Sequence, residues 1–334
     1  MALILAIESS CDETAVAVLR GEKGCATQIL ASEVSSQIEL HREFGGVVPE
    51  LASRNHSLHL RPLVEKALVD AGVAMDQIDA FAATTGPGLA SSLLIGSTAA
   101  KAMACAMGKP FLGINHLEGH LLSPFVLETE VPPHLALIVS GGHTLLIDVE
   151  AAGKYHKLGG TRDDAAGEAY DKVGKMLGLP YPGGPEIEKV AVGCDARAYD
   201  FPRSMLHDPH LDFSFSGLKT AVLYTMQREE NPEVGNLAAS FQQAVIDILT
   251  GKTLQALRKT GWKVIALSGG VSMNRALRGA FREVADRAGV RLAIASPALC
   301  TDNAAMIGFA GLLRHLNGES SRLDADISPN LPLV

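Results

Sequence analysis

Two histidines four residues apart, His116 and His120 in the segment NHLEGH, are the residues in this sequence whose spacing most suggests chemistry. On a helix this spacing places both imidazoles on one face, which is a common way to hold a metal ion. A zinc protease of the H-E-x-x-H type has its general-base glutamate directly after the first histidine, but here that position is Leu117 and the glutamate is Glu118. The pair leaves three alternatives: a protease, another metal enzyme, or two histidines that merely share a helix face.

A third metal ligand is available in Asp302, in the segment TDNAAMIG. Asp302 precedes a predicted helix, so its carboxylate either caps that helix or binds the metal. If it joins the histidines, the result is a two-histidine, one-carboxylate site with open coordination positions. Such a site polarises a carbonyl or phosphoryl group as a Lewis acid.

Three carboxylates, Glu8, Asp12 and Glu13, crowd the turn in the segment ESSCDET. Carboxylates so close together repel unless they are solvated, bound to a cation or poised for proton transfer. A simple solvated turn therefore remains an alternative to a site.

Two Ser-Gly-Gly loops, at 140–142 and 268–270, each follow an apolar run that predicts a strand. Glycines let backbone N–H groups approach phosphate oxygens, although an ordinary tight turn explains either loop alone. Neither the P-loop pattern nor an ordered G-x-G-x-x-G follows a strand, so any nucleotide is held differently. Asp171 and Glu188 flank the segment PYPGGP and are candidates for binding ribose hydroxyls, unless this is only a surface loop.

The elements that position these residues form a repeated pattern. Strand–turn–strand units are predicted at 2–20 and 135–150, and a strand followed by a helix is predicted at 263–281. We expect further helices at 56–73, 89–108, 167–178, 236–261 and 301–318, and further strands at 80–88 and 110–115.

This pattern predicts an α/β protein of two halves, each opened by a β-hairpin, with a ligand between them. We expect a first domain at 1–130, onto which a helix at about 303–318 packs back. The second domain is expected at 131–334, with an irregular Gly/Pro-rich insertion at about 160–235. The best linker candidate is 128–134.

Composition narrows the class of protein. The chain has 334 residues and a net charge of -8, so it lacks the overall basic charge of a stand-alone nucleic-acid binder. If the substrate is a nucleic acid, a local basic patch or a partner protein would have to attract it. Its five cysteines include no C-x-x-C, which favours reduced thiols in the cytoplasm. Acidic residues follow the start too soon for a signal peptide, and no apolar run approaches the roughly 20 residues of a membrane helix.

Eight motifs occur in one order along the chain: AIESSCDET, TGPGLASSLLIG, NHLEGH, IVSGGHT, DDAAGEAYDK with YPGGP, FSFSGLKT, LSGGVSMN and TDNAAMIG. In these motifs the chain closely resembles the bacterial TsaD family of tRNA N6-adenosine threonylcarbamoyltransferases. The resemblance implies an actin-like fold of the sugar kinase and Hsp70 type, in which two related α/β domains flank a nucleotide cleft.

The resemblance also implies an activity. The threonylcarbamoyl group would pass from threonylcarbamoyl-AMP to the exocyclic N6 amine of the adenosine 3′ of the anticodon, in tRNAs that read codons beginning with A, and AMP would leave. The implied partners are tRNA, a smaller actin-like paralogue (TsaB-like) that pairs through the first domain, and a small P-loop ATPase (TsaE-like), with no membrane. The alternatives are a small-molecule kinase of the same fold, a non-enzymatic scaffold and, less favoured, a metalloprotease.

Site residues follow from the resemblance position by position. The implied metal ligands are His116, His120 and Asp302, holding one divalent ion per subunit, with Fe(2+) favoured over Zn(2+). Asp12 and Glu13 match the acidic hairpin tip near the reactive group. The implied adenylate-binding residues are Ile138, Val139, Ser140, Gly141, Gly142, Asp171, Gly184, Glu188 and Asn274.

One position departs from the archaeal and eukaryotic relatives, which have a metal-binding tyrosine where this chain has Ile138. Isoleucine cannot bind a metal, so we expect a more open site.

For tRNA, the basic candidates are Arg42, Arg54 and Lys219, which we expect to be insufficient at this net charge. The small-residue helix at 89–108 either packs in the core or lies near the pairing surface.

Overall fold

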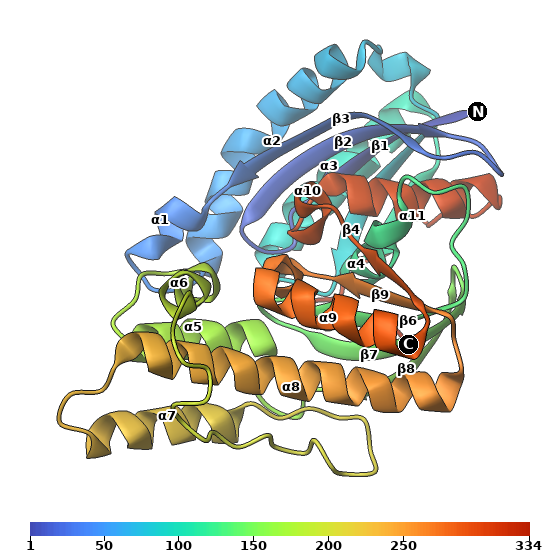
Figure 1. Ribbon diagram of the computed structural model, residues 1–334. Helices are drawn as coiled ribbons and strands as arrows, with labels where there is room; N and C mark the ends of the chain where they lie inside the picture. The colour runs from blue at the N-terminus through green and yellow to red at the C-terminus, as the bar shows by residue number, and fades with distance from the viewer. The chain divides into compact units, whose positions relative to one another are not determined.

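The computed structural model describes residues 1–334, which divide into two compact units. The first unit comprises Met1–Val131 and Ala295–Val334, and the second comprises Pro132–Ile294. Figure 1 shows the helices and strands of both units, coloured along the chain.

The first unit is built on a five-stranded sheet in the order β3-β2-β1-β4-β5. Its strands are β1 (Ala2–Glu8), β2 (Glu13–Gly21), β3 (Gln28–Ser36), β4 (Ala80–Gly86) and β5 (Phe111–Asn115). β1 pairs antiparallel with β2 and parallel with β4, and β2 and β3 are antiparallel. The central strands β1 and β4 are almost entirely buried and apolar, as expected for strands covered on both faces.

The first unit also contains six α-helices. They are α1 (Ile38–Arg42), α2 (Pro49–Ala71), α3 (Ala90–Met107), α4 (His116–Leu122), α10 (Pro297–Cys300) and α11 (Ala304–Leu316). Side chains of α2 and α3 share an apolar core with β1, β2 and β4, whereas α11 contacts the same strands and α4. A side chain at Gly311 would collide with Ala82, 2.9 Å from the Cβ position, so this glycine lets α11 lie close to β4.

Helix α3 is by length and composition apolar enough to cross a membrane. It contacts β1 and β4 instead, and Gly96 lies so close to the strand that a Cβ would be 2.9 Å from Ile7 Cγ2. Its small residues thus allow close packing on one side, while Leu94 on the same helix is 47% exposed, so part of α3 also lies at the surface.

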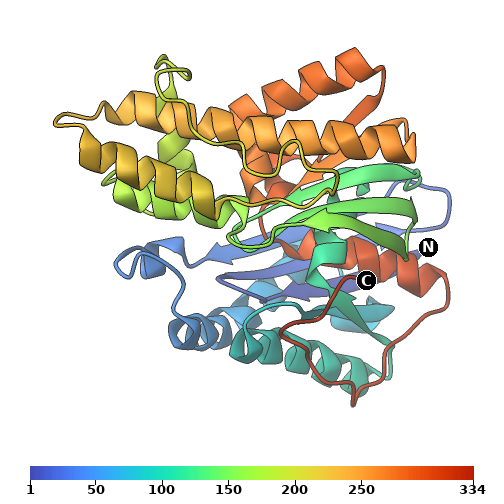
Figure 2. The same cartoon turned by 90° about the horizontal axis from the view of Figure 1, so that it is seen from below.

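The second unit has a five-stranded sheet in the order β10-β9-β6-β7-β8. Its strands are β6 (His134–Val139), β7 (Thr144–Ala151), β8 (Lys154–Gly160), β9 (Val264–Ser268) and β10 (Arg291–Ile294). Its helices are α5 (Ala166–Met176), α6 (Gly183–Ala191), α7 (Ser216–Arg228), α8 (Val234–Thr260) and α9 (Arg275–Ala288), and Figure 2 shows them in a second view.

The two sheets share one topology. In each, the first strand pairs antiparallel with the second and parallel with the fourth, and the second pairs antiparallel with the third. The fifth strand is parallel to the fourth in both. The prediction of two related α/β halves, each opened by a β-hairpin, is confirmed.

The structure differs from the predicted second domain of 131–334 in its C-terminal part, because Ala295–Val334 belongs to the first unit. The chain there hydrogen-bonds to first-unit backbone: Ser321 N donates to Phe111 O at 2.7 Å, and Ser328 N donates to Thr85 O at 2.8 Å. The region 160–235, expected to be irregular, contains helices α6 and α7.

Candidate functional site

Helix α4 brings the two histidines together in the first unit. It begins directly after β5, and its N-cap residue Asn115 accepts a hydrogen bond from Leu117 N at 2.9 Å. His116 Nε2 lies 3.5 Å and His120 Nε2 3.1 Å from Asp302 Oδ1. The three ligand atoms lie within 4.8 Å of one another, a spacing that one metal ion can bridge.

The carboxylate of Asp302 is not the cap of α11. Asn303 caps that helix, because its Oδ1 accepts a hydrogen bond from Met306 N at 2.9 Å. The capping interpretation of Asp302 is therefore wrong, and its side chain faces the histidines.

Glu8 lies behind His116, away from Asp302. Its fully buried carboxylate accepts hydrogen bonds from Thr84 Oγ1 at 2.6 Å and from Ser10 N, and its Oε2 is 3.1 Å from His116 Nδ1. Burial opposes the charge of Glu8, but His116 and Thr84 hold its pKa below the usual range. A carboxylate on Nδ1 fixes the proton there and leaves the Nε2 lone pair for a metal.

Negative charge accumulates around the three candidate ligands. Burial, followed by the carboxylates of Asp302 and Asp12, raises the pKa of Glu13 to about 10. Although burial lowers the pKa of His116, Asp302 and Glu8 raise it to about 9. Two imidazoles and a carboxylate, surrounded by further carboxylates, fit a divalent cation whose charge would relieve this repulsion.

Glu118, the glutamate next to the position of the general base in H-E-x-x-H proteases, is engaged in an ion pair. It is 3% exposed, and its Oε2 lies 3.4 Å from Arg314 Nη2 on α11. The ion pair ties α4 to α11, which gives Glu118 a structural role.

In the second unit, the Ser140-Gly141-Gly142 loop connects β6 to β7. Ser140 closes the turn, because its N donates to His143 O at 2.8 Å and its Oγ accepts from His143 N at 3.1 Å. Gly141 and Gly142 are exposed, and no atom lies within 4 Å of a Cβ placed on either. Their N–H groups have no acceptor within the chain and are available to an anion.

Glycines also bring neighbouring segments against this loop. A Cβ on Gly167, in the first turn of α5, would lie 2.6 Å from Ser140 O. Gly269 has φ of 88° and lies against Val139, where a Cβ would be 2.7 Å from the carbonyl carbon. Ile138 and Val139 themselves are buried and paired within the sheet, so they support the loop rather than present side chains to a ligand.

The other predicted adenylate residues connect α5 to α6, α6 to α9, and α9 to α8. Gly183 N, beside Gly184, donates to Asp171 Oδ1 at 2.7 Å. Arg275 N donates to Glu188 Oε1 at 2.8 Å. Asn274 caps α9 by accepting from Leu277 N at 2.9 Å, and its Nδ2 donates to Gln242 Oε1 at 2.6 Å. Their contact with an adenylate stays a prediction.

The predicted residues thus form two sets. His116, His120 and Asp302, with Asp12 and Glu13, belong to the first unit, and the predicted adenylate residues belong to the second. Sequence reasoning missed the role of Glu8; the available signal was a carboxylate that ends an otherwise apolar strand.

Known proteins resemble this chain over almost its whole length. The family described as TsaD, tRNA N6-adenosine threonylcarbamoyltransferase, matches residues 28–309. The chain belongs to the TsaD family. A tRNA N6-adenosine threonylcarbamoyltransferase of Geobacter sp. (strain M21) is 51% identical over 99% of this chain and 96% of its own length. The one of Anaeromyxobacter sp. (strain Fw109-5) is 49% identical over 98% of each chain.

Solved structures confirm the predicted actin-like fold. The HypF protein of T. kodakarensis superposes with a TM-score of 0.66 at 13% identity, over 95% of this chain and 48% of its own. Component A of the Acidaminococcus fermentans (R)-2-hydroxyglutaryl-CoA dehydratase gives 0.54 at 14% identity, over 92% and 97%. Membership of the TsaD family makes this chain a transferase that acts in tRNA modification.

Proposed function

We propose that this TsaD-family protein transfers the threonylcarbamoyl group from threonylcarbamoyl-AMP to the N6 amine of the adenosine 3′ of the anticodon. The N6 nitrogen attacks the carbamoyl carbon, the bond from that carbon to the phosphate oxygen breaks, and AMP leaves while the amine loses a proton. The observation that carries the proposal is the convergence of His116, His120 and Asp302, with Glu8 fixing His116 from behind.

An ion on these three ligands would act as a Lewis acid toward the threonylcarbamoyl carbonyl, and we propose Fe(2+) before Zn(2+). The chain's own residues supply the rest. The free N–H groups of Gly141 and Gly142 bind the phosphate of the adenylate, and Asp171 and Glu188 accept hydrogen bonds from the ribose.

The two hairpin carboxylates have different tasks in this proposal. Burial and the carboxylates of Asp302 and Asp12 raise the pKa of Glu13 when no cation is bound, and a cation on Asp302 would oppose this effect, so we assign Glu13 to electrostatic positioning of the reacting group. Asp12 is the carboxylate that accepts the proton from the attacking amine. An aryl amine is a poor nucleophile, so holding it close to the carbonyl contributes as much as proton transfer.

Partners complete the proposal. A pocket of about 760 Å³ lies between α2 and α3, and its lining includes Leu60, Val64, Ile95 and Met103. Leu58 and Val69, on the same helix α2, are 72% and 77% exposed. We assign this apolar surface to the smaller actin-like paralogue, with the P-loop ATPase as a further component in the cytoplasm.

The test is to incubate the protein with threonylcarbamoyl-AMP and unmodified tRNA, with and without partners, and to detect modified adenosine by mass spectrometry. The wild type should form the product, and the His116→Ala variant should lose both bound metal and transfer. Full activity in a metal-free His116→Ala protein would refute the role of the site. ATP turnover on a small substrate, with no tRNA product, would favour the kinase alternative.

A further inference from the structure

Positive charge is concentrated in one segment of this acidic chain. Residues 251–294 contain nine lysines and arginines but only two acidic residues, Glu283 and Asp286, while the whole chain has a net charge of -8. The segment covers the last ten residues of α8, then β9, α9 and β10, all within the second unit. A protein that repels polyanions overall can attract one at such a patch.

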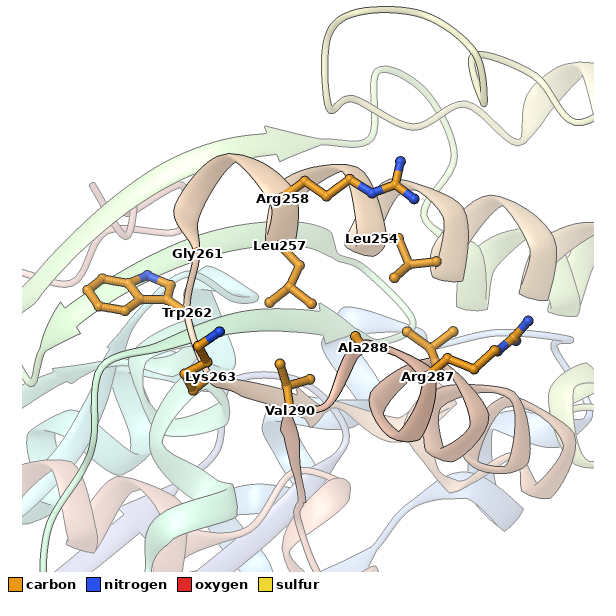
Figure 3. Close-up of a pocket in the computed structure, with 10 residues that line it drawn as sticks. Leu254, Leu257, Arg258, Gly261, Trp262, Lys263, Arg287, Ala288 and Val290 are labelled. Carbon is orange, nitrogen blue, oxygen red and sulfur yellow. The ribbon is translucent and has the colours of Figure 1, made fainter.

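A pocket of about 520 Å³ lies where α8 and α9 end (Figure 3). Its apolar lining includes Leu254, Leu257 and Val290. Arg258 extends from α8 and Arg287 from α9 on either side of it, and Lys263 lies on the turn that leads into β9. The nearby Trp262 is held in place, because its Nε1 donates to Asp148 Oδ1 at 2.6 Å.

The cations of this pocket have few carboxylate neighbours. Arg258 and Lys263 have no carboxylate within 4.0 Å, and Arg287 Nη2 makes one loose contact of 3.7 Å with Glu283. The basic residues that we first considered for tRNA are instead paired. Arg42, Arg54 and Lys219 lie 2.7, 2.5 and 3.0 Å from Glu39, Glu50 and Asp164, respectively.

Basic residues in the last turn of a helix often only complement its dipole. That explanation covers Arg258 and Arg287, which lie in the last turns of α8 and α9. The helix-dipole explanation does not apply to Lys263, which lies beyond the end of α8. It also gives no reason for both helices to end at one pocket. The convergence therefore indicates a ligand with several negative charges.

We propose that this pocket, formed by the ends of α8 and α9, binds the phosphate backbone of the tRNA substrate; the inference rests on the proposed function. Guanidinium groups bind phosphate in a bidentate manner, and lysine adds a point charge. A volume of about 520 Å³ is within the range of small-ligand sites and suits one or two nucleotides.

The test measures binding of unmodified tRNA to the full chain by fluorescence anisotropy, between about 50 and 200 mM salt. The variant Arg258→Gln/Lys263→Gln should bind about tenfold more weakly at low salt, and the slope of log K against log salt should fall by roughly 0.7 to 0.9 per lost contact. The control Lys23→Gln/Lys154→Gln removes two other exposed, unpaired cations and should bind like wild type.

Equal affinity and slope in the pocket variant and the wild type would overturn the inference, as would binding to vesicles of anionic lipid with none to tRNA. If thermal unfolding shows that the double variant is misfolded, Lys263→Gln alone tests the point, since Lys263 caps no helix. Pocket-dependent binding without any transfer by wild type would refute only the proposed function. Transfer with pocket-independent binding would refute only this inference.

Discussion

The carboxylate of Glu8 holds the imidazole of His116 by its Nδ1 atom, at 3.1 Å, in a fully buried position. The hydrogen bond sets the ring so that Nε2 faces Asp302, 3.5 Å away. Glu8 touches neither of the other candidate ligands in this way, so it acts through His116.

We therefore predict that Glu8→Gln weakens metal binding about 10- to 100-fold while the protein stays folded, because a neutral amide no longer stabilises the ligand. Metal titration followed by calorimetry, together with circular dichroism, measures both effects. The control is Glu118→Gln. It removes the charge of another buried carboxylate, on helix α4, which pairs with Arg314 and not with a candidate ligand. Unchanged metal affinity in Glu8→Gln would contradict the positioning role.

Asp12 is predicted to act in the transfer and not in holding the adenylate. Asp12→Ala should lose about 10²- to 10⁴-fold in transfer rate, the usual contribution of a general base. Its affinity for AMP, measured by calorimetry, should match that of wild type, because AMP lacks the reacting group. Parallel losses of transfer and AMP binding would make Asp12 a binding residue.

The cap at Asn303 should be visible in stability. Asn303→Ala removes the acceptor of Met306 N and should lower the free energy of unfolding by about 1 kcal/mol. Denaturant unfolding measures this, and Asn303→Ser should restore most of the loss, since serine is an equally good cap. If Asn303→Ala has no effect while Asp302→Ala destabilises the fold, the capping residue has been misassigned.

His134 should make stability depend on pH. Burial is the main cause that lowers its pKa from 6.5 to about 4, so between these values the unfolded chain binds more protons than the folded one. The contribution of His134 to the free energy of unfolding should be fully present above pH 6.5. It should be lost as the pH drops toward 4, by up to about 3 kcal/mol. Denaturant unfolding of wild type and His134→Leu across this range gives the difference; identical pH profiles would contradict the assignment.

Much of the fold could be predicted from apolar runs, and the exceptions share a physical reason. The hairpin strands β1, β2, β6 and β7 are mostly apolar and buried, so their pattern is strong. The strands that were not predicted, β3 and β8, lie at the edges of their sheets and carry exposed polar side chains, Ser in β3 and Lys in β8. The third missed strand, β10, has only four residues.

For the site, local spacing identifies His116 and His120, but nothing local connects them to Asp302, which lies 182 residues beyond His120. That connection came from the resemblance to a family. The competing cap interpretation could be rejected only from the hydrogen bond of Asn303, one residue further along. Glu8 was missed because its significance depends on which residues face it, and its partner His116 is 108 residues away.

The first unit is closed by the last segment of the chain, Ala295–Val334, which carries Asp302. During synthesis the histidines therefore emerge long before their third partner, and the whole second unit is translated in between. A chain that ends before Asp302 has only two of the three candidate ligands, so the candidate metal site can form only after the whole second unit has been translated.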